Sequence, residues 1–560
     1  MKITLETKHG VLQCKLDGRI LDKLREMPGR TKWKDRDLVF DPTAMNINYL
    51  KEVFPDAVWD DRAKRLLGLD ALAELEAEST RIKKLPPEAT AFPFKTTPRD
   101  HQLKAFTWAR HREYFAYFME MGTGKSKTLI DVIASKWSSG EIDCFLLLAP
   151  NGVHAQWLGE QIPLHMPVLV QYIGHTHRPT RKAPEELFEP THKLRILCLN
   201  IEAMSHDSGV RLATRFAASG RCFTAVDEST VIKTPGSKRS KATRKIGLQS
   251  AGRAILSGAP ITRGIEDIYG QFLFLHEDAL GFSSFYTFRN RYCDVVPAYH
   301  GAPHGVVRVT GHRNMEEFTK KVDAHSFRVT KEECLDLPPK VYLERHVELT
   351  LQQKRIYKEI TQDLYAQLED RLITMDSAIE QILRLQQVVC GHLPNEEGNG
   401  YAVLDSNRVK DMLHWLDECG DKVVIWARFI ADIDLICKAL GGHNHEFVRY
   451  DGQVKQGLRD ANRDRWLNDP KCRVMVANPA AAARGQNWQI AQDVGYYSNS
   501  FDADHRWQSE DRTHRDGMKG TCTYTDFIAP GIDRKILAAL LGKKNVADAV
   551  LDDPKSWLET

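Results

Sequence analysis

The stretch "MEMGTGKSKT" at residues 119–128 decides the fold of this chain. It follows "EYFAYF" at residues 113–118, an aromatic run of strand length, and it leads into "SKTLIDVIASKW", whose apolar residues fall on nearly every helical face. A strand, a glycine-rich turn and a buried helix in this order predict a phosphate-binding loop. The strict pattern begins with glycine, whereas this chain has Met119 at that position.

Each residue type in the loop has a role in holding phosphate. Glycines let backbone amides surround phosphate oxygens, and the start of the helix adds partial positive charge. We expect Lys125 to reach the terminal phosphates and Ser126 to ligate Mg²⁺. The predicted nucleotide-binding residues of the loop are Gly122, Thr123, Gly124, Lys125, Ser126 and Lys127. The alternative is a turn whose glycines serve only packing.

A second motif, "CFTAVDEST" at residues 222–230, is an apolar strand that ends in two carboxylates. A magnesium-dependent hydrolase needs this pair. Asp227 is predicted to hold the metal, and Glu228 is predicted to orient and deprotonate the attacking water. The alternative is the acidic N-cap of a helix, for which the same four letters are suitable.

The composition of the chain limits the classes of protein to which it can belong. A chain of 560 residues should bury several cores, and a formal charge of +3 with a pI near 8.2 permits a polyanionic partner without demanding one. Its 11 cysteines include no C-x-x-C pair, which favours a reducing compartment. No apolar run reaches membrane-spanning length and the first residues do not resemble a signal peptide, so we expect a cytoplasmic protein without a membrane partner.

Phosphoryl transfer also needs positive charge near the γ-phosphate in the transition state. The stretch "HRWQSEDRTHRDGM" at residues 505–518 carries Arg512 and Arg515, which would be neighbours on a helix. Their distance from the loop along the chain predicts a second lobe that closes over the nucleotide. Taken alone, the stretch is equally typical of a solvated helix of mixed charge.

The order of these motifs resembles that of Swi/Snf-type ATPases, the translocase branch of superfamily-two helicases, over roughly residues 95–540. The phosphate loop of that family does not begin with glycine either, which accounts for Met119. By the same resemblance, "PRDHQLKAFTWA" places Gln102 near the adenine with Arg99 beside it, and both are predicted nucleotide-binding residues. "AILSGAPITRG" is similar to the family's coupling element, with Ser257 and Gly258 between the ATP and DNA sites.

The resemblance implies an α/β fold with two RecA-like lobes, helical protrusions and a small α+β N-terminal module. It implies ATP and Mg²⁺ as cofactors, with Ser126 and Asp227 on the metal and Lys125, Glu228, Arg512 and Arg515 as catalytic residues. The expected partner is double-stranded or forked DNA, with single-stranded DNA or RNA left open. We expect a nucleoid-associated monomer in a bacterial or phage-infected cell, with no protein partner identified.

The domain boundaries follow from the same alignment. The expected segments are an N-terminal module (1–85), a linker (86–98), a first lobe (99–265), a helical protrusion with the inter-lobe junction (266–345), a second protrusion (346–420), a second lobe (421–530) and a C-terminal helical tail (531–560). The N-terminal module resembles the small HARP-type module of some annealing helicases and of phage or bacterial relatives. A small scaffold with Trp33 in its core is the alternative.

Candidate nucleic-acid contacts lie in two places. The basic run at residues 232–246 and the loop "PAAAARGQNW" are expected to face phosphates, although this loop lacks the family's earlier glycine pair. The predicted contacts are Lys233, Lys238, Arg239, Lys241 and Asn487. A charge run is also typical of a solvated face.

Three histidines, His300, His304 and His312, lie in a Gly/Pro-rich stretch. No cysteine or carboxylate stands at ligand spacing within that stretch, so we expect a solvated loop and no metal site there.

The predicted function is an ATP-dependent DNA translocase or helicase. Three alternatives stay open: a strand-separating or annealing fork-remodelling helicase, a nucleic-acid-bound interaction or inhibitor protein with weak or lost ATPase, and a motor that displaces polymerase or another DNA-bound protein.

Overall fold

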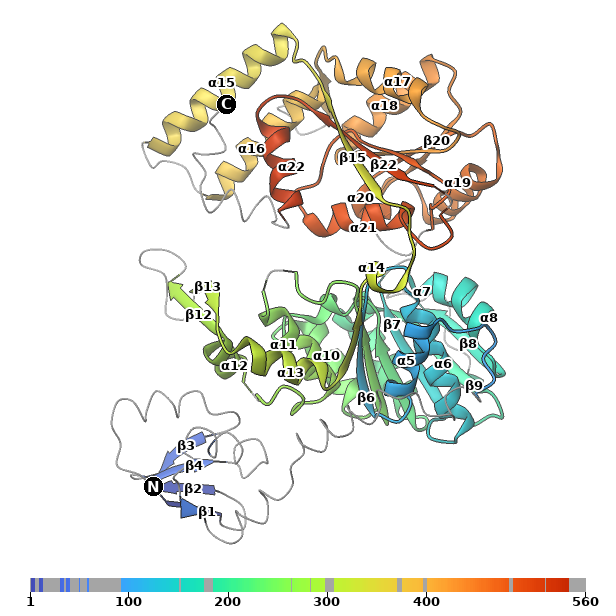
Figure 1. The fold of residues 1–560 in the computed structure, drawn as a ribbon, viewed down its shortest axis with the longest axis vertical. Helices are drawn as coiled ribbons and strands as arrows, with labels where there is room; N and C mark the ends of the chain where they lie inside the picture. Colours follow the sequence, from blue (N-terminus) through green and yellow to red (C-terminus); the bar gives the residue numbers. More distant parts are fainter. Residues whose placement is uncertain are drawn as a thin grey trace. The chain divides into compact units, whose positions relative to one another are not determined.

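The computed structural model of this chain describes residues 92–542 and several short segments before them (Figure 1). Within that range the positions outside the description are 151–152, 176–184, 263, 283, 298–306, 370–374, 396–399, 483–486 and 519. Before it, the described residues are 2–5, 10–13, 31–34, 37–40, 50 and 58–59. The chain forms two compact units, Met1–Cys334 and Leu335–Thr560.

Unit 1 contains a seven-stranded parallel sheet in the order β14-β6-β11-β10-β7-β9-β8. The strands are β6 (Tyr114–Met119), β7 (Cys144–Ala149), β8 (Val170–His175), β9 (Leu194–Asn200), β10 (Cys222–Val226), β11 (Gly252–Leu256) and β14 (Ser326–Val329). Every residue of β7 and β9 is buried, as expected for parallel strands that are covered on both faces.

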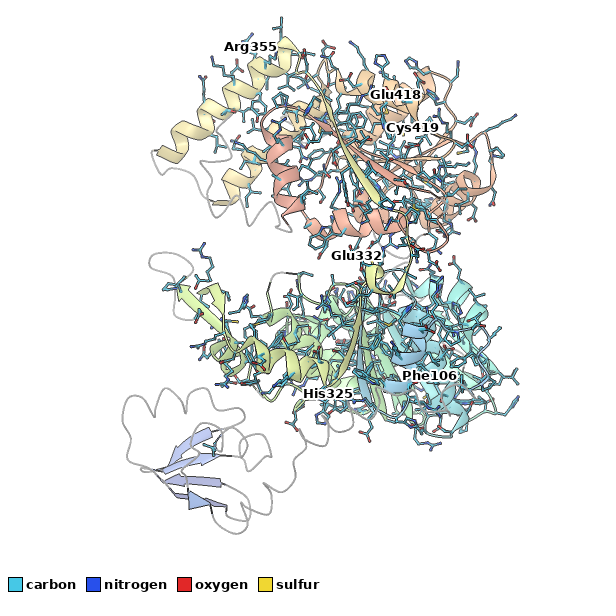
Figure 2. The ribbon with its side chains drawn as sticks, viewed as in Figure 1. Phe106, His325, Glu332, Arg355, Glu418 and Cys419 are labelled. Atoms are coloured by element: carbon cyan, nitrogen blue, oxygen red, sulfur yellow. The ribbon has the colours of Figure 1, made fainter. Side chains whose placement is uncertain are left out.

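Helices cover both faces of this sheet. On one face, α5 (Asp100–Ala109) and α6 (Lys125–Ser138) share a core with the strands, into which Phe106 is packed (Figure 2). On the other face, α9 (Asp207–Ala217), α10 (Lys238–Gly247) and α11 (Glu266–Leu275) enclose a second core. The remaining helices of unit 1 are α7 (Val153–Gln156), α8 (Ile162–His165), α12 (Phe285–Tyr292), α13 (Met315–Asp323) and α14 (Lys331–Cys334).

The topology gathers three loops at one edge of the sheet. Strands β6, β11 and β10 are adjacent and parallel, so their carboxyl ends lie side by side. The phosphate loop follows β6, Ser257 follows β11 and Asp227 follows β10. Open α/β sheets bind ligands at this edge, where the chain crosses over to strands on the other side.

Unit 2 contains a six-stranded sheet, also parallel, in the order β15-β22-β21-β18-β20-β19. Its strands are β15 (Lys340–His346), β18 (Val423–Trp426), β19 (Phe447–Tyr450), β20 (Val474–Ala477), β21 (Asp493–Tyr496) and β22 (Cys522–Ile528). Its helices are α15 (Leu351–Glu369), α16 (Met375–Cys390), α17 (Arg408–Glu418), α18 (Ile430–Gly442), α19 (Gln456–Asn468), α20 (Pro479–Ala482), α21 (Ala503–Thr513) and α22 (Ile532–Leu541). Two parallel sheets flanked by helices confirm the predicted α/β fold class.

The strand pairings place several segment boundaries differently from the sequence expectation. The expected protrusion and junction at 266–345 contains β14, which pairs with β6 in the first sheet, and β15, which pairs with β22 in the second. Leu385 of α16 and Met412 of α17, from the expected second protrusion at 346–420, lie in the core of unit 2. The expected tail at 531–560 begins with α22, which buries Ile536 in that core, and residues 543–560 lie outside the described part.

Two antiparallel hairpins accompany the large sheets. In unit 1, β12 (Cys293–Pro297) pairs with β13 (Val307–His312), with Cys293 opposite His312 at the base of the hairpin. This hairpin follows α12 and projects from that side of the unit (Figure 1). In unit 2, β16 (His392–Pro394) pairs with β17 (Tyr401–Val403).

The first residues of the chain form a five-stranded sheet in the order β3-β4-β2-β1-β5. Its strands are β1 (Lys2–Leu5), β2 (Gly10–Gln13), β3 (Thr31–Lys34), β4 (Asp37–Phe40) and β5 (Val58–Trp59). The stretch "DLVF" at residues 37–40 forms β4.

Two further expectations concern cysteines and membranes. The ten cysteines in the described part of the chain are all free thiols. None of the described helices combines the length and the apolar character that a membrane crossing requires.

Candidate functional site

The phosphate loop connects β6 to α6 through two glycines in the left-handed region. Gly122 has a φ of 85° and Gly124 a φ of 93°, values that other residues rarely adopt. A Cβ atom on Gly124 would lie 2.2 Å from Nε2 of Gln102, so the close packing of α5 on the loop also requires glycine. Gly124 caps α6, whose first turn therefore presents its backbone N–H groups at the loop, as an anion site requires.

Lys125 is buried at the start of α6, with its ammonium inside the loop. Its Nζ donates a hydrogen bond to the carbonyl of Met119, at 2.8 Å. A Cβ atom on Gly258 would lie 3.5 Å from this Nζ and 3.1 Å from the backbone nitrogen of Met121. The predicted coupling element after β11 therefore packs directly on the phosphate loop. Ser126, the predicted magnesium ligand in this loop, is half-buried in the first turn of α6.

The start of α5 holds the loop from the other side. Gln102 donates from Nε2 to the carbonyl of Thr123 at 3.0 Å and accepts at Oε1 from the backbone N–H of Arg99 at 3.1 Å. His101 contacts the same carbonyl through Nε2, at 2.7 Å. The predicted pair Gln102 and Arg99 is thus placed beside the loop, with the Arg99 side chain exposed. His101 lies in the same motif, but no part of the sequence pattern singled it out.

Lys127 is placed differently from the other loop residues. Its ammonium forms a buried ion pair with Asp131 one turn along α6 and lies 5.0 Å from the ring centre of Phe94. The Lys127 side chain is thus held between Asp131 of α6 and Phe94, in the segment just before α5. A nucleotide contact for Lys127 stays a prediction.

Asp227 sits at the end of β10 with both carboxylate oxygens hydrogen-bonded. Oδ2 accepts from Nε1 of the buried Trp157 at 2.7 Å, and Oδ1 accepts from the backbone N–H of Glu228 at 2.9 Å. Trp157 comes from the helical segment after β7, so this contact joins two neighbouring loops at the same sheet edge. Sequence reasoning missed Trp157, because nothing in the local pattern links an indole to a carboxylate seventy residues away.

Glu228 has a φ of 50°, an uncommon conformation for a residue other than glycine. It occupies the N-cap position of the short helix Ser229–Ile232, but its side chain makes no capping hydrogen bond. The capping alternative for the acidic pair therefore does not account for this carboxylate, which is half-buried beside Asp227. Outliers of this kind concentrate at functional sites.

The titration of Asp227 gives a testable pH dependence. Burial, with a smaller contribution from the Glu228 carboxylate, raises the pKa of Asp227 to about 6, while the Trp157 hydrogen bond and the Lys125 charge oppose the rise. Mg²⁺ needs the ionised carboxylate. Because the raised pKa favours the protonated form, magnesium affinity should be retained above pH 6 and lost as pH falls through that value.

Trp157→Phe removes one hydrogen bond to the ionised form, so the pKa of Asp227 should rise further, by about 0.5–1 unit for a bond worth about 1 kcal/mol. The measurement is the Mg²⁺ concentration that gives half-maximal ATP hydrolysis, on either side of pH 6. An acid limb that coincides in the two proteins would show that Asp227 is not the titrating ligand.

The acidic motif is joined to the coupling element through α11. Ser229 donates from Oγ to Oε1 of Gln271 at 2.6 Å, and Nε2 of Gln271 donates to the carbonyl of Pro260 at 2.7 Å. This chain carries Ser229 and Thr230 directly after the acidic pair. The buried Gln271 provides the physical connection between the two loops.

The basic run after the acidic motif divides into two sets. Lys233 is bound to Thr262 and Asp267, the latter at 3.3 Å, and Arg239 is half-buried. The lysines of α10 are exposed along one face of the helix, at i, i+3 and i+7: Lys238, Lys241 and Lys245. Of the predicted contacts in this run, Lys238 and Lys241 are therefore the ones placed to meet a large anionic partner.

In unit 2, Arg512 lies in the last turn of α21 (Ala503–Thr513), and Arg515 follows the end of that helix. Arg512 is 1% exposed, and its carbonyl accepts from the backbone N–H of Trp488 at 2.9 Å. Arg515 is half-buried, and its guanidinium donates to Oδ1 of Asn487, which is exposed. The structure therefore brings together Arg515 and Asn487, which were predicted for different roles.

A buried ion network fixes α21 on its sheet. Arg506 is hydrogen-bonded to Glu510 at 2.8 Å and to Asp526 of β22, with its guanidinium 3.5 Å from the ring centre of Tyr496. Glu510 also accepts from Nζ of Lys340 at 2.9 Å. These contacts set the orientation of the helix that presents Arg512.

Residues 101–393 match the model of the SNF2-related domain, and residues 406–517 match that of the helicase conserved C-terminal domain. Similar curated proteins include the TATA-binding protein-associated factor mot1 of Aspergillus fumigatus (22% identical, 88% of this chain and 29% of that protein), human chromodomain-helicase-DNA-binding protein 1 (22%, 80% and 26%) and the human DNA annealing helicase and endonuclease ZRANB3 (26%, 60% and 30%).

The chain thus spans less than a third of the length of these relatives. Among solved structures, it is similar to the Sulfolobus solfataricus SWI2/SNF2 ATPase core in complex with dsDNA, at 23% identity and a TM-score of 0.37, over 83% of this chain and 95% of that one. These curated relatives are eukaryotic, and the family matches begin at residue 101. They lend no support to the phage or bacterial type or to a HARP-like module, and both stay predictions.

Proposed function

Because the chain belongs to the SNF2-related family of ATPases, we propose that it hydrolyses ATP in response to duplex DNA and moves along the duplex as it does so. The observation that carries the proposal is the convergence of three loops at one sheet edge. Lys125, Asp227 and Gly258 follow three adjacent strands, and Lys125 lies against both its own loop and the loop of Gly258. Phosphate binding, metal binding and the position of the coupling element would therefore depend on one another.

The donor set fits MgATP. The backbone N–H groups of the loop and the Lys125 ammonium would bind the phosphates, while the Ser126 hydroxyl and the Asp227 carboxylate are oxygen ligands of the kind that Mg²⁺ prefers. Mg²⁺, when bound, neutralises charge on the β- and γ-phosphates. Glu228 would orient the attacking water and accept its proton. Trp157 would hold Asp227 in position.

We place duplex DNA on the exposed lysine face of α10. Phosphate contacts from lysines carry affinity without sequence preference, which suits a protein that moves along DNA. Two relatives named above support a nucleic-acid partner, since one is a DNA-binding protein and another a DNA annealing helicase by name. The second name also keeps the fork-remodelling alternative open, and the name of mot1 keeps the protein-displacing alternative open.

The test is steady-state ATP hydrolysis with no nucleic acid, single-stranded DNA, duplex DNA, forked DNA and RNA. We expect strong stimulation by duplex DNA, and we expect Lys125→Ala to remove both the basal and the stimulated rates, which controls for contaminating ATPases. A further preference for forks would favour the remodelling alternative. Hydrolysis that no nucleic acid changes would contradict the proposal and favour the interaction-protein alternative.

The α10 face supplies a matched pair of variants for a measurement of duplex DNA affinity at several salt concentrations. Lys238→Gln with Lys241→Gln should flatten the slope of log affinity against log salt by roughly two units, because about one counterion is released for each neutralised phosphate. Lys233→Gln is the control, since its ammonium is already bound to Thr262 and Asp267. An unchanged slope in the double variant would remove α10 from the interface.

A further inference from the structure

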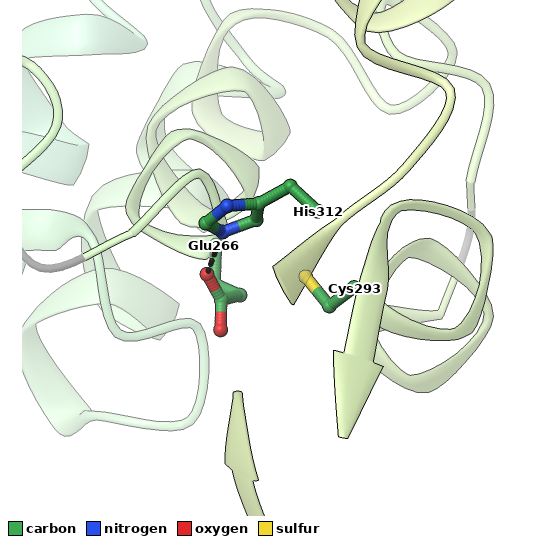
Figure 3. A group of neighbouring side chains, drawn as sticks. All are labelled: Glu266, Cys293 and His312. Carbon is green, nitrogen blue, oxygen red and sulfur yellow. Dashed lines mark ion pairs between the residues drawn. The ribbon is translucent and has the colours of Figure 1, made fainter. Parts of the chain in front are cut away.

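A cluster of three potential metal ligands lies outside the nucleotide site, where the β12–β13 hairpin meets α11. One carboxylate oxygen of Glu266, Sγ of Cys293 and a ring nitrogen of His312 all lie within 4.8 Å of one another (Figure 3). Glu266 is the first residue of α11, Cys293 the first of β12 and His312 the last of β13. The two hairpin residues are direct cross-strand partners, which keeps their side chains close.

The Glu266 carboxylate gives a second, independent indication that this cluster binds a ligand. Its Oε2 is buried and accepts no hydrogen bond from any described residue, and Nε2 of His312 stands 4.0 Å away, beyond hydrogen-bond distance. A buried carboxylate oxygen without a partner is costly. A Cβ atom on residue 264 would lie 2.4 Å from the same oxygen, so Gly264 leaves the space that this carboxylate occupies.

The ligand chemistry identifies the class of ion. Thiolate, imidazole and carboxylate together are typical ligands of Zn²⁺, with bond lengths of about 2.0–2.3 Å and a tetrahedral arrangement. Tetrahedral ligand atoms at those lengths are about 3.5 Å apart. Here Nε2 of His312 lies 4.0 Å from Oε2 of Glu266 and no separation exceeds 4.8 Å, so side-chain rotation of the exposed His312 can bring the ligand atoms to zinc-binding distances.

We infer that Glu266, Cys293 and His312 bind one Zn²⁺ ion, with water as the fourth ligand, and that this ion fastens the base of the β12–β13 hairpin to α11. His312 gives access from solvent, while Cys293 is 2% exposed and closes the inner side. Binding forms a sulfur–zinc bond and releases the thiol proton to solvent. No oxidation or reduction takes place.

This inference departs from the expectation that the histidine stretch is a solvated loop without a metal site. That expectation searched for a cysteine or carboxylate within the stretch, whereas the fold supplies both from elsewhere in the chain. His300 and His304 lie outside the described residues, so His312 is the one histidine of this stretch that the inference uses. The site also lies next to the coupling element. Asp267, the residue after Glu266 in α11, accepts a hydrogen bond from the backbone N–H of Thr262 at 2.9 Å.

The experiment is a titration of chelator-treated, full-length protein with Zn²⁺ against a chromophoric chelator. We expect one tight equivalent in the wild type and in His192→Ala, an exposed histidine of the same unit. His312→Ala should weaken that equivalent by more than about 100-fold, the upper end of the effect of losing an outer-sphere partner. Because His312 is exposed, this variant should stay folded, which unchanged nucleotide binding verifies.

A second measurement identifies the sulfur. Co²⁺ in place of Zn²⁺ should give a thiolate-to-metal charge-transfer absorption in the wild type that Cys293→Ser lacks, and bound Zn²⁺ should protect Cys293 from alkylation. A wild type that binds no zinc, or an equivalent that survives both substitutions unchanged, would overturn the inference. Neither readout depends on ATP hydrolysis, so the outcome is independent of the proposed function.

Discussion

Glu228→Gln should lower ATP turnover by about 10²–10⁴-fold, the range for loss of a general base, while nucleotide binding stays close to that of the wild type. The substitution keeps the size of the side chain and removes its negative charge together with its ability to accept a proton. It leaves the hydrogen bond from the backbone N–H of residue 228 to Asp227 in place, and it removes a carboxylate that helps to raise the pKa of Asp227, so binding of Mg²⁺ should not be weakened. The measurements are single-turnover hydrolysis and the affinity for a fluorescent ATP analogue.

Glu277→Gln is the matched control, because that carboxylate forms an exposed ion pair with Arg244 in the same unit. Its turnover should equal that of the wild type. If Glu228→Gln retained turnover within about tenfold, another group would have to accept the proton, and the assignment from the acidic motif would be wrong. If it lost nucleotide affinity as well, Glu228 would hold the nucleotide or metal instead of the water.

Local patterns predicted the elements that carry the phosphate loop. The strand expected at 113–118 is β6 at Tyr114–Met119, and the buried helix expected after the glycines is α6. The apolar run before Asp227 is β10. Both strands are buried, apart from the half-buried Tyr114 at the start of β6, and each is followed by a polar or glycine-rich turn, so the signal lies within a few residues of sequence.

Pairings between distant segments could not be predicted in this way. β14 pairs with β6 of the first sheet and β15 pairs with β22 of the second, although the two strands are close in sequence. β15 also has several exposed residues, so its sequence pattern does not indicate a strand of a large sheet. The boundary between the units lies between Cys334 and Leu335, inside the segment 266–345 that was expected to hold a helical protrusion and the inter-lobe junction.

The contacts that organise the site are also non-local. Trp157 reaches Asp227 from another loop, and Gln271 links Ser229 to Pro260 from a helix beyond both. The zinc cluster follows the same rule, since Glu266 comes from a helix and its two companions from a hairpin. A sequence motif gives the reacting groups, whereas the fold determines the residues that orient them.

Arg512→Gln and Arg515→Gln test the largest predicted contribution to catalysis from unit 2. An arginine that stabilises the charge on the transferring phosphoryl group is worth about 10³–10⁵ in turnover. We expect a loss in that range for at least one variant, with affinities for nucleotide and duplex DNA changed by less than about tenfold, because the interaction forms mainly in the transition state. Single-turnover hydrolysis on saturating duplex DNA, together with the two binding constants, measures it.

The environments of the two arginines make the pair informative. Arg512 is buried, so its substitution can disturb α21 itself, whereas Arg515 is half-buried and bound to the exposed Asn487. Thermal unfolding therefore accompanies each assay, and Arg465→Gln, which removes an exposed arginine paired with Glu446, is the control expected to match the wild type. If both variants stayed folded and kept turnover within about tenfold of the wild type, neither arginine would stabilise the transition state.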